Sequence, residues 1–178
     1  RDSPVNARIH VRGVVTLQRR GENIFLQDGS GGLQVESRQL TVFAPGDVVE
    51  AVGFPGIENY LPVLEDAVLR KMDRPPVAIA PTPATVQEIQ RGLHHAGFIS
   101  LTGRLLNRTM RQVLGRQGSP TGKRITLVLQ SDNFIFTAEV NEPAEEQWVN
   151  SIPLGSTVDV SGVCVAEIDS DGVVKSFR

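Results

Sequence analysis

The stretch that decides the fold occurs twice in this chain, as PGDVVEAVG over residues 45–53 and as LGSTVDVSG over residues 154–162. A second matching pair precedes these copies, IHVRGVV over residues 9–15 and ISLTGRL over residues 99–105. An apolar strand that ends near a glycine, followed by a glycine turn, a strand and a second glycine, is the layout of a small β-barrel. Because the pattern is written twice, the sequence predicts two barrels in tandem.

Length and composition agree with two small domains. The chain has 178 residues, enough for two domains of roughly 75–90 residues each. Apolar residues make up 40%, which is enough for packed cores, and the formal charge of −2 predicts no general attraction to polyanions. The single Cys164 excludes an internal disulfide framework, and no run of 18 apolar residues is present to span a membrane.

Each half contains the strands of one barrel. In the first half we expect strands over 7–19, 24–28, 33–37, 48–54 and 61–71, with a hairpin at the four residues 29–32. Five strongly twisted strands with bending glycines are typical of an OB-type barrel. The segment 38–46 is too short for the helix that usually bridges strands three and four, so we expect a loop there.

The second half repeats this order after a linker. Four prolines within residues 73–84 are typical of a linker, and Thr85 followed by Glu88 predicts a short capped helix over 86–92. Strands are expected over 97–107, 123–131, 133–140, 156–166 and 173–178, with a short helix in 142–149.

The predicted fold is therefore all-β with minor α: two tandem five-stranded OB-type Greek-key barrels, the second with a short helix between strands three and four. The predicted domains are 1–72 for barrel one, 73–95 for the linker and 96–178 for barrel two. We expect the last strand to be truncated at Arg178 and the chain, which starts at Arg1, to be an excised fragment.

The predicted connection between the first two strands of the second barrel is the most unusual surface. It carries no acid, several glycines and six basic residues: Arg104, Arg108, Arg111, Arg116, Lys123 and Arg124. This connection borders the ligand face of an OB barrel, so it could clamp an anion through its guanidinium groups. The alternative is a solvated hairpin that pairs with the acids of 139–146.

The small number and the placement of aromatic residues argue against binding of nucleic acid. They make up only 5% of the chain, and binding of single strands relies on exposed rings that stack on bases. Phe25, Phe134 and Phe136 lie in apolar runs and are predicted to be core residues. Tyr60 is the better candidate for an exposed ring at a ligand-binding surface.

Catalysis and cofactors find no support in the sequence. No cysteine or histidine spacing fits zinc, and no nucleophile stands in a recognisable elbow. Cys164 lies in an apolar strand and is predicted to be an inert core residue. We expect no enzyme activity in this fragment, no metal and no cofactor.

The motifs VRGVVT (residues 11–16), IFLQDGSGGLQV (24–35) and PGDVVEAVGF (45–54) resemble the tandem OB-like region found ahead of membrane segments in some bacterial sensor histidine kinases and related signalling proteins. LPVL (61–64), SGVC (161–164) and KSFR (175–178) fit the same resemblance, which covers nearly the whole chain. It implies an extracytoplasmic, periplasmic input module of an inner-membrane protein, whose kinase machinery lies beyond Arg178.

Two interpretations follow. The first is a non-catalytic sensor or interaction domain, for which a small anionic ligand, a protein partner and a second copy of the chain all remain open as partners. The alternative is a cytoplasmic nucleic-acid-binding tandem OB protein that uses the basic arm at 104–124. For an anion held by this arm, we expect the double substitution Arg108→Ala and Arg111→Ala to abolish binding with little loss of thermal stability.

Overall fold

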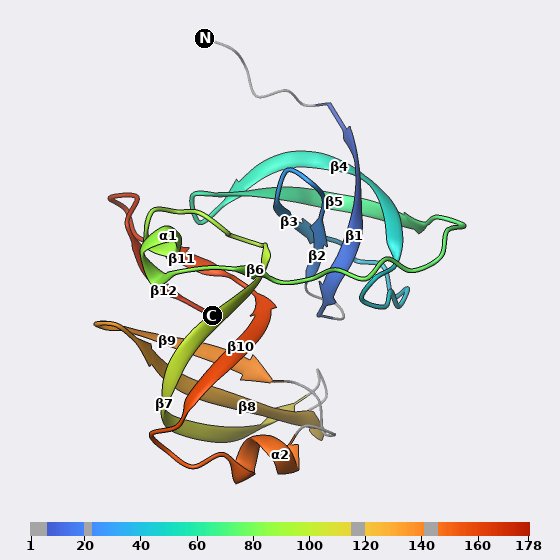
Figure 1. Ribbon diagram of the computed structural model, residues 1–178. Helices are drawn as coiled ribbons and strands as arrows, with labels where there is room; N and C mark the ends of the chain where they lie inside the picture. The colour runs from blue at the N-terminus through green and yellow to red at the C-terminus, as the bar shows by residue number, and fades with distance from the viewer. Residues whose placement is uncertain (1–6, 20–22, 115–119, 141–145) are drawn as a thin grey trace.

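β-strands make up most of the chain, and two short helices accompany them (Figure 1). The computed structural model describes residues 7–19, 23–114, 120–140 and 146–178. The elements in chain order are β1 (Ile9–Gln18), β2 (Asn23–Gln27), β3 (Gly32–Glu36), β4 (Val48–Glu58), β5 (Leu61–Lys71), β6 (Thr82–Pro83), α1 (Val86–Gln90), β7 (Phe98–Leu114), β8 (Pro120–Ser131), β9 (Phe134–Val140), α2 (Glu146–Ser151), β10 (Thr157–Val163), β11 (Ala166–Ile168) and β12 (Val174–Phe177). Within these described ranges, neither helix is long and apolar enough to cross a membrane.

The first five strands close into a barrel. Its order is β1-β2-β3-β5-β4, with β1 antiparallel to β4 and β3 parallel to β5. This is the strand order of an OB-type Greek-key barrel, so the prediction for the first half is confirmed. Alternate residues of β2 and its neighbours fill the interior, among them Val15, Ile24, Leu26 and Val35, each 3% exposed or less. No helix forms over 38–46, as predicted.

The second unit, comprising β6–β12 with α1 and α2, is not a closed five-stranded barrel. Its main sheet has the order β10-β7-β8-β9, with β6 beside β7, while β11 and β12 pair only with each other. The second barrel of the prediction is therefore not confirmed. Its helix is confirmed in place, because α2 lies between β9 and β10. The domain boundaries at 72 and 95 stay a prediction.

The last strand of the second unit contacts the main sheet through side chains. In the barrel, β5 has 11 residues and pairs with both β3 and β4. By contrast, β12 has 4 residues and reaches the sheet through side chains. The ring of Phe177 stacks on Phe134 and Phe136, with centroids 5.3 and 5.0 Å apart, within the range of favourable aromatic pairs. The predicted core role of Phe134 and Phe136 agrees with this cluster.

The sequence repeat is a structural repeat down to its hydrogen bonds. In the barrel, Gly46 N–H donates to the Val15 carbonyl (2.8 Å), and Val15 N–H donates to the Asp47 carbonyl (2.9 Å). In the second unit, Gly155 N–H donates to the Leu105 carbonyl (2.7 Å), and Leu105 N–H donates to the Ser156 carbonyl (2.8 Å). Both glycines have positive φ, +94° and +88°, which L side chains rarely adopt. The glycine turn therefore ties the start of the fourth strand to the middle of the first in both halves.

Several predicted boundaries need correction. The strand predicted over 48–54 runs on to Glu58 as β4, and the predicted connection at 104–124 is mostly the two arms of a long hairpin, β7 and β8. In both places the backbone stays paired with its neighbouring strand: β4 with β5, and β7 with β8. The helix prediction is confirmed in its cap: Glu88 N–H donates to the Thr85 hydroxyl (3.3 Å), and the Glu88 carboxylate accepts from Thr85 N–H (2.8 Å).

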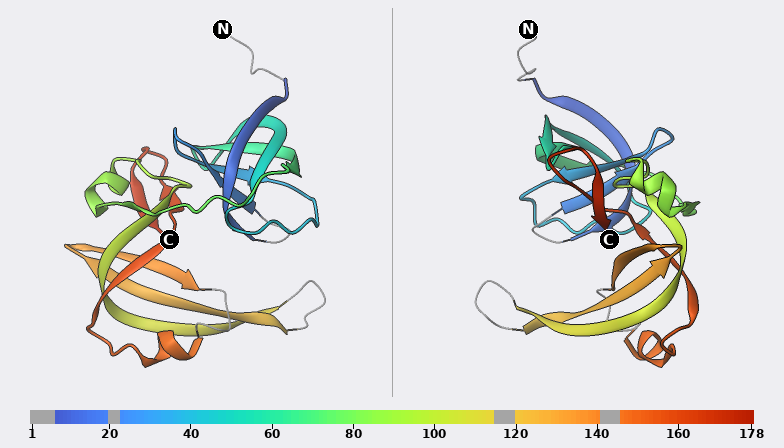
Figure 2. Two further views of the ribbon diagram at one scale, coloured as in Figure 1. Left: turned by 45° about the vertical axis from the view of Figure 1, so that its right-hand side comes forward. Right: turned by 90° about the vertical axis from the view of Figure 1, so that its left-hand side faces the viewer.

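The barrel and the second unit pack against each other, and the β11–β12 hairpin lies between the barrel and the main sheet of the second unit (Figure 2). The Phe98 N–H donates to the side-chain oxygen of Gln27 on the barrel (2.7 Å). The backbone of Ala96 passes so close to Gly32 that a Cβ added to this glycine would lie 2.2 Å from the Ala96 carbonyl. Only a glycine permits this approach, so residue 32 controls how closely the units pack.

We predict that Gly32→Ala loosens the two units, because the new methyl group would overlap the Ala96 carbonyl. The expected loss is about 1–3 kcal/mol of unfolding free energy, measured by urea titration, with faster proteolysis within residues 73–95. Gly29→Ala is the matched control in the same hairpin, since a Cβ there meets no atom within 4 Å. Equal stability and equal cleavage of the two variants would contradict the close packing.

Candidate ligand-binding site

The outer face of β2 and β3 is buried, although it points away from the core of the barrel. Ile24 and Leu26 face inward, so Phe25 between them faces outward, opposite Gln34 on β3. Phe25 is nevertheless 1% exposed and Gln34 7% exposed. Phe25 was predicted to be a core residue; it is buried, but outside the core cluster of the barrel. Beside it lies a cavity that residues of the second unit also line.

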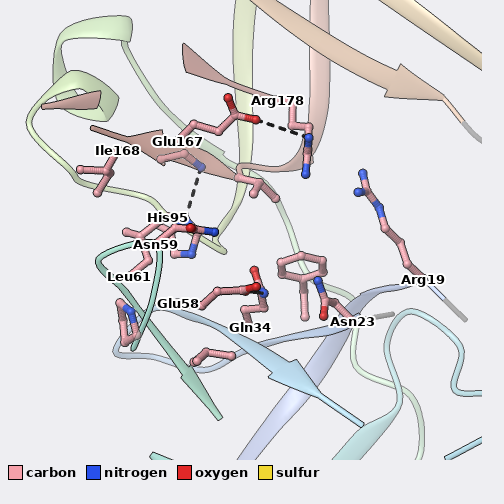
Figure 3. A pocket seen from close by; sticks show the side chains of 15 residues that line it. Arg19, Asn23, Gln34, Glu58, Asn59, Leu61, His95, Glu167, Ile168 and Arg178 are labelled. Carbon is pink, nitrogen blue, oxygen red and sulfur yellow. Dashed lines mark hydrogen bonds and ion pairs between the residues drawn. The ribbon is translucent and has the colours of Figure 1, made fainter. Parts of the chain in front are cut away.

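A cavity of about 400 Å³ separates this face from the second unit (Figure 3). On the barrel side it is bordered by the β1–β2 connection at Arg19 and Asn23, and by the β4–β5 turn at Glu58 and Asn59. In an OB barrel the face of strands two and three, with these two connections, is where ligands bind. On the other side the lining residues are His95, Val165, Ala166, Glu167, Ile168 and Arg178. The ligand face of the barrel therefore forms one wall of a cleft between the units.

Charged groups of both signs line the cavity. The Gln34 amide donates to the Glu58 carboxylate (2.9 Å), and the Arg178 guanidinium lies 3.4 Å from the Glu167 carboxylate. Arg19 reaches across the interface to Glu139 of β9 at 3.0 Å, and both of these side chains are 16% exposed. Such a cavity, of a few hundred Å³ with few but convergent polar groups, fits a small polar molecule.

His95 holds the wall of the second unit in place. Its Nδ1 accepts a hydrogen bond from the backbone N–H of Ala166 (3.3 Å), so the proton of the neutral ring is on Nε2. Burial lowers the pKa of His95, which keeps the ring neutral. His95 thus connects the segment that follows α1 to the hairpin that lines the cavity.

The basic residues of the arm that the structure describes are spread along the β7–β8 hairpin. Arg111 on β7 pairs in register with Arg124 on β8, and Lys123 is adjacent, so these three cations share one end of the hairpin. Arg104 lies seven residues from Arg111 along β7, or about 20 Å. Arg116 lies outside the described residues. The Arg124 guanidinium is 3.8 Å from Glu139, in agreement with the alternative of pairing to the acids of 139–146.

Arg108 has a structural role. Its guanidinium donates to the carbonyls of Val149 and Ile152, the latter at 2.6 Å, at the end of α2. A cation suits this position, because the last carbonyls of a helix lack partners within the helix. The expectation that Arg108→Ala with Arg111→Ala costs little thermal stability therefore needs correction at Arg108.

Tyr60 lies on the surface, as expected, and is 64% exposed. It forms, with Asn59, the two-residue turn between β4 and β5 at one border of the cavity. Both residues have positive φ, +49° and +66°. A tyrosine in this region is strained, and strain of this kind is frequent at binding sites.

The sequence did not predict the most important residues of the cleft. Phe25 reads as core because its neighbours are apolar, and Gln34 reads as an ordinary exposed strand residue. The alternation of β2 carries the signal that Phe25 faces outward, but only the packing of the second unit reveals that this face is covered. Arg19, His95 and Arg178 come from three distant segments, which no local pattern connects.

In the described part of the chain, no group of three or more His, Cys, Asp or Glu residues is placed to hold a metal ion. Cys164 is 2% exposed, as predicted for a core residue, and burial raises the pKa of its thiol to about 12.

No protein-family model matches the chain, and no curated protein sequence matches it. Among solved structures, a chain of a replication protein A heterotrimer bound to ssDNA is similar at a TM-score of 0.40 and 13% identity; the match covers 90% of this chain and 45% of that one. A murine DNA binding protein bound with ds DNA is similar at a TM-score of 0.45 and 6% identity, covering 96% and 97%. These TM-scores are too low to carry a fold or a function to this chain.

We predict that Arg108→Ala lowers the free energy of unfolding by about 1.5–3 kcal/mol, because two hydrogen bonds from a charged donor are lost. Arg111→Ala, on the exposed end of the same strand, is expected to change it by less than about 0.5 kcal/mol. Chemical denaturation of both variants measures the difference. An equal free energy of unfolding for the two variants would contradict the stabilising role of Arg108 at α2.

Proposed function

We propose that this chain is a non-catalytic recognition module that binds a small ligand in the cleft between its two units. The observation that carries this proposal is the position of the barrel's ligand face: β2, β3 and the two bordering connections face the second unit across a cavity of about 400 Å³. A ligand there would touch both units at once.

Such a site can convert binding into a change of packing. A ligand shifts an equilibrium between two arrangements only if it binds them with different affinity. Contacts from the barrel and from the β11–β12 hairpin exist together only when the units are closed, so a ligand that uses both stabilises that arrangement.

The same arrangement suits the input region of a bacterial signal-transduction histidine kinase. In this proposal the module is extracytoplasmic, and the movement of β12 passes to whatever follows it in the parent protein. The support is the resemblance carried by the glycine and turn motifs, together with the cleft that β12 helps to form.

The test combines binding with a distance measurement. Four probe classes (inorganic phosphate, dicarboxylates, neutral sugars and α-amino acids) are screened by thermal shift. Spin labels at Arg38→Cys and Asn133→Cys report the distance between the units; the buried Cys164 does not compete for the label. We expect one class to raise the melting temperature and narrow the distance distribution.

Asn23→Phe, which fills the cavity from β2, is expected to abolish both effects, while Thr109→Phe on the exposed face of β7 leaves them intact. Absence of any response to all four classes, or binding that survives Asn23→Phe, would contradict ligand binding in the cleft.

A second candidate function is binding of nucleic acid. The observation in its favour is the group of cations at one end of the β7–β8 hairpin, where Arg111 faces Arg124 beside Lys123. Fluorescence anisotropy with single-stranded DNA and RNA at two salt concentrations separates the candidates. Binding that falls steeply with salt and is lost in Arg111→Ala with Lys123→Ala would favour nucleic acid; Asn23→Phe would then leave it unchanged.

A further inference from the structure

Two charged groups in the cleft lack a full complement of partners. The first is the guanidinium of Arg19, whose terminal nitrogen pairs with Glu139 at 3.0 Å. Its Nε is buried and has no hydrogen-bond partner among the described residues. A buried N–H without an acceptor is costly. Because the Nε is not accessible from the cavity, a ligand would meet Arg19 at the other atoms of its side chain, which lines the cavity.

The second group is the carboxylate of Glu58. It accepts a hydrogen bond from the neutral amide of Gln34, and no cation among the described residues lies within ion-pair distance of it. The surroundings are negative: burial raises the pKa of Glu36, and the charges of Glu58, Glu65 and Asp66 raise it further. This side of the cavity therefore attracts a positive charge.

The two groups lie on opposite sides of the cavity. Figure 3 shows the guanidinium groups of Arg19 and Arg178 on one side and the Glu58 carboxylate on the other. Arg178 is held at 3.4 Å from Glu167, which fixes it near the cavity while leaving its other nitrogens for a ligand. One side of the cavity thus has two guanidinium groups, each next to a carboxylate (Glu139 or Glu167), and the other side has a carboxylate without a cation at ion-pair distance among the described residues.

We infer that the cleft binds a small zwitterion of the α-amino-acid type. This inference rests on the proposed ligand-binding function and names its ligand class. The ligand carboxylate lies between Arg19 and Arg178 and accepts from their guanidinium groups. The ligand ammonium lies against Glu58, an exposed carboxylate with no cation at ion-pair distance among the described residues.

Ligands of a single charge fit less well. A dicarboxylate or phosphate would satisfy Arg19 but bring a second negative charge toward Glu58, where like charges already raise the pKa of Glu36. A neutral sugar would satisfy neither charge fully. Because Arg19 and Glu58 belong to the barrel and Arg178 to the second unit, a zwitterion held by all three bridges the units.

Calorimetry on the whole chain tests the ligand class. The probes are glycine, serine, glutamine and lysine, each compared with its carboxamide, which lacks the carboxylate, and with its N-acetyl form, which lacks the ammonium. We expect at least one amino acid to bind, and both of its derivatives to bind at least about tenfold more weakly, since each loses a charged contact.

Matched variants locate the contacts. Glu58→Gln is expected to weaken binding of the amino acid by about tenfold and to leave the affinity for its N-acetyl form unchanged. Asp73→Asn, at an exposed acid outside the cavity, is expected to have no effect. Arg19→Gln is expected to weaken binding of the amino acid but not binding of its carboxamide. Arg38→Gln is its control, because the Arg38 side chain is 94% exposed.

Several outcomes would overturn the inference. A dicarboxylate, phosphate or sugar that binds in the cleft while no amino acid does would show that the ligand class is wrong and the binding function correct. N-acetyl derivatives that bind as tightly as the amino acids would remove the role of Glu58. No response to any probe class, with unchanged distances between the units, would remove both the inference and the proposed function.

Discussion

The outer face of β2 and β3 is the surface on which the rest of the structure depends. Phe25 points away from the barrel core and is 1% exposed, beside the cavity that the second unit also lines. Burial of a whole phenylalanine side chain stabilises by about 1.5–3 kcal/mol. The close approach of Ala96 to Gly32, the Gln27 acceptor for Phe98 and the Arg19–Glu139 ion pair all lie around this face. Together these contacts orient the barrel relative to the second unit.

The cleft follows from this packing. The hairpin β11–β12 covers the barrel face only in part: Leu61 packs against Ala166 and Val174, and beyond this apolar contact the polar cavity begins. A surface that OB barrels commonly use for ligands is thereby narrowed to a site of small-molecule size. The same packing makes that barrel face less suited to a long polymer, which leaves the cations of the β7–β8 hairpin as the surface for nucleic acid in the alternative proposal.

The sequence predicted the local parts of this architecture well. The glycine turns at Gly46 and Gly155 were predictable because a turn with positive φ favours glycine, which is a local signal. The cap of α1 was predictable from Thr85 and Glu88. The openness of the second sheet was not predicted, because closure depends on long-range pairing of β12. For the same reason the basic residues at 104–124 were grouped by their nearness in sequence. In the structure Arg108 turns toward α2, while Arg111 and Arg124 meet across the ladder.

The central claim is that the second unit covers the outer face of β2 and β3 in solution. The most direct test is the rate at which a thiol reagent modifies Phe25→Cys, compared with Ile57→Cys on the same barrel; the native side chains are 1% and 76% exposed. The native Cys164 is buried and adds little background. If the units pack as described, Phe25→Cys reacts far more slowly than Ile57→Cys and becomes reactive when Gly32→Ala is added. Equal rates at the two positions would mean that the barrel face is open and that no cleft exists between the units.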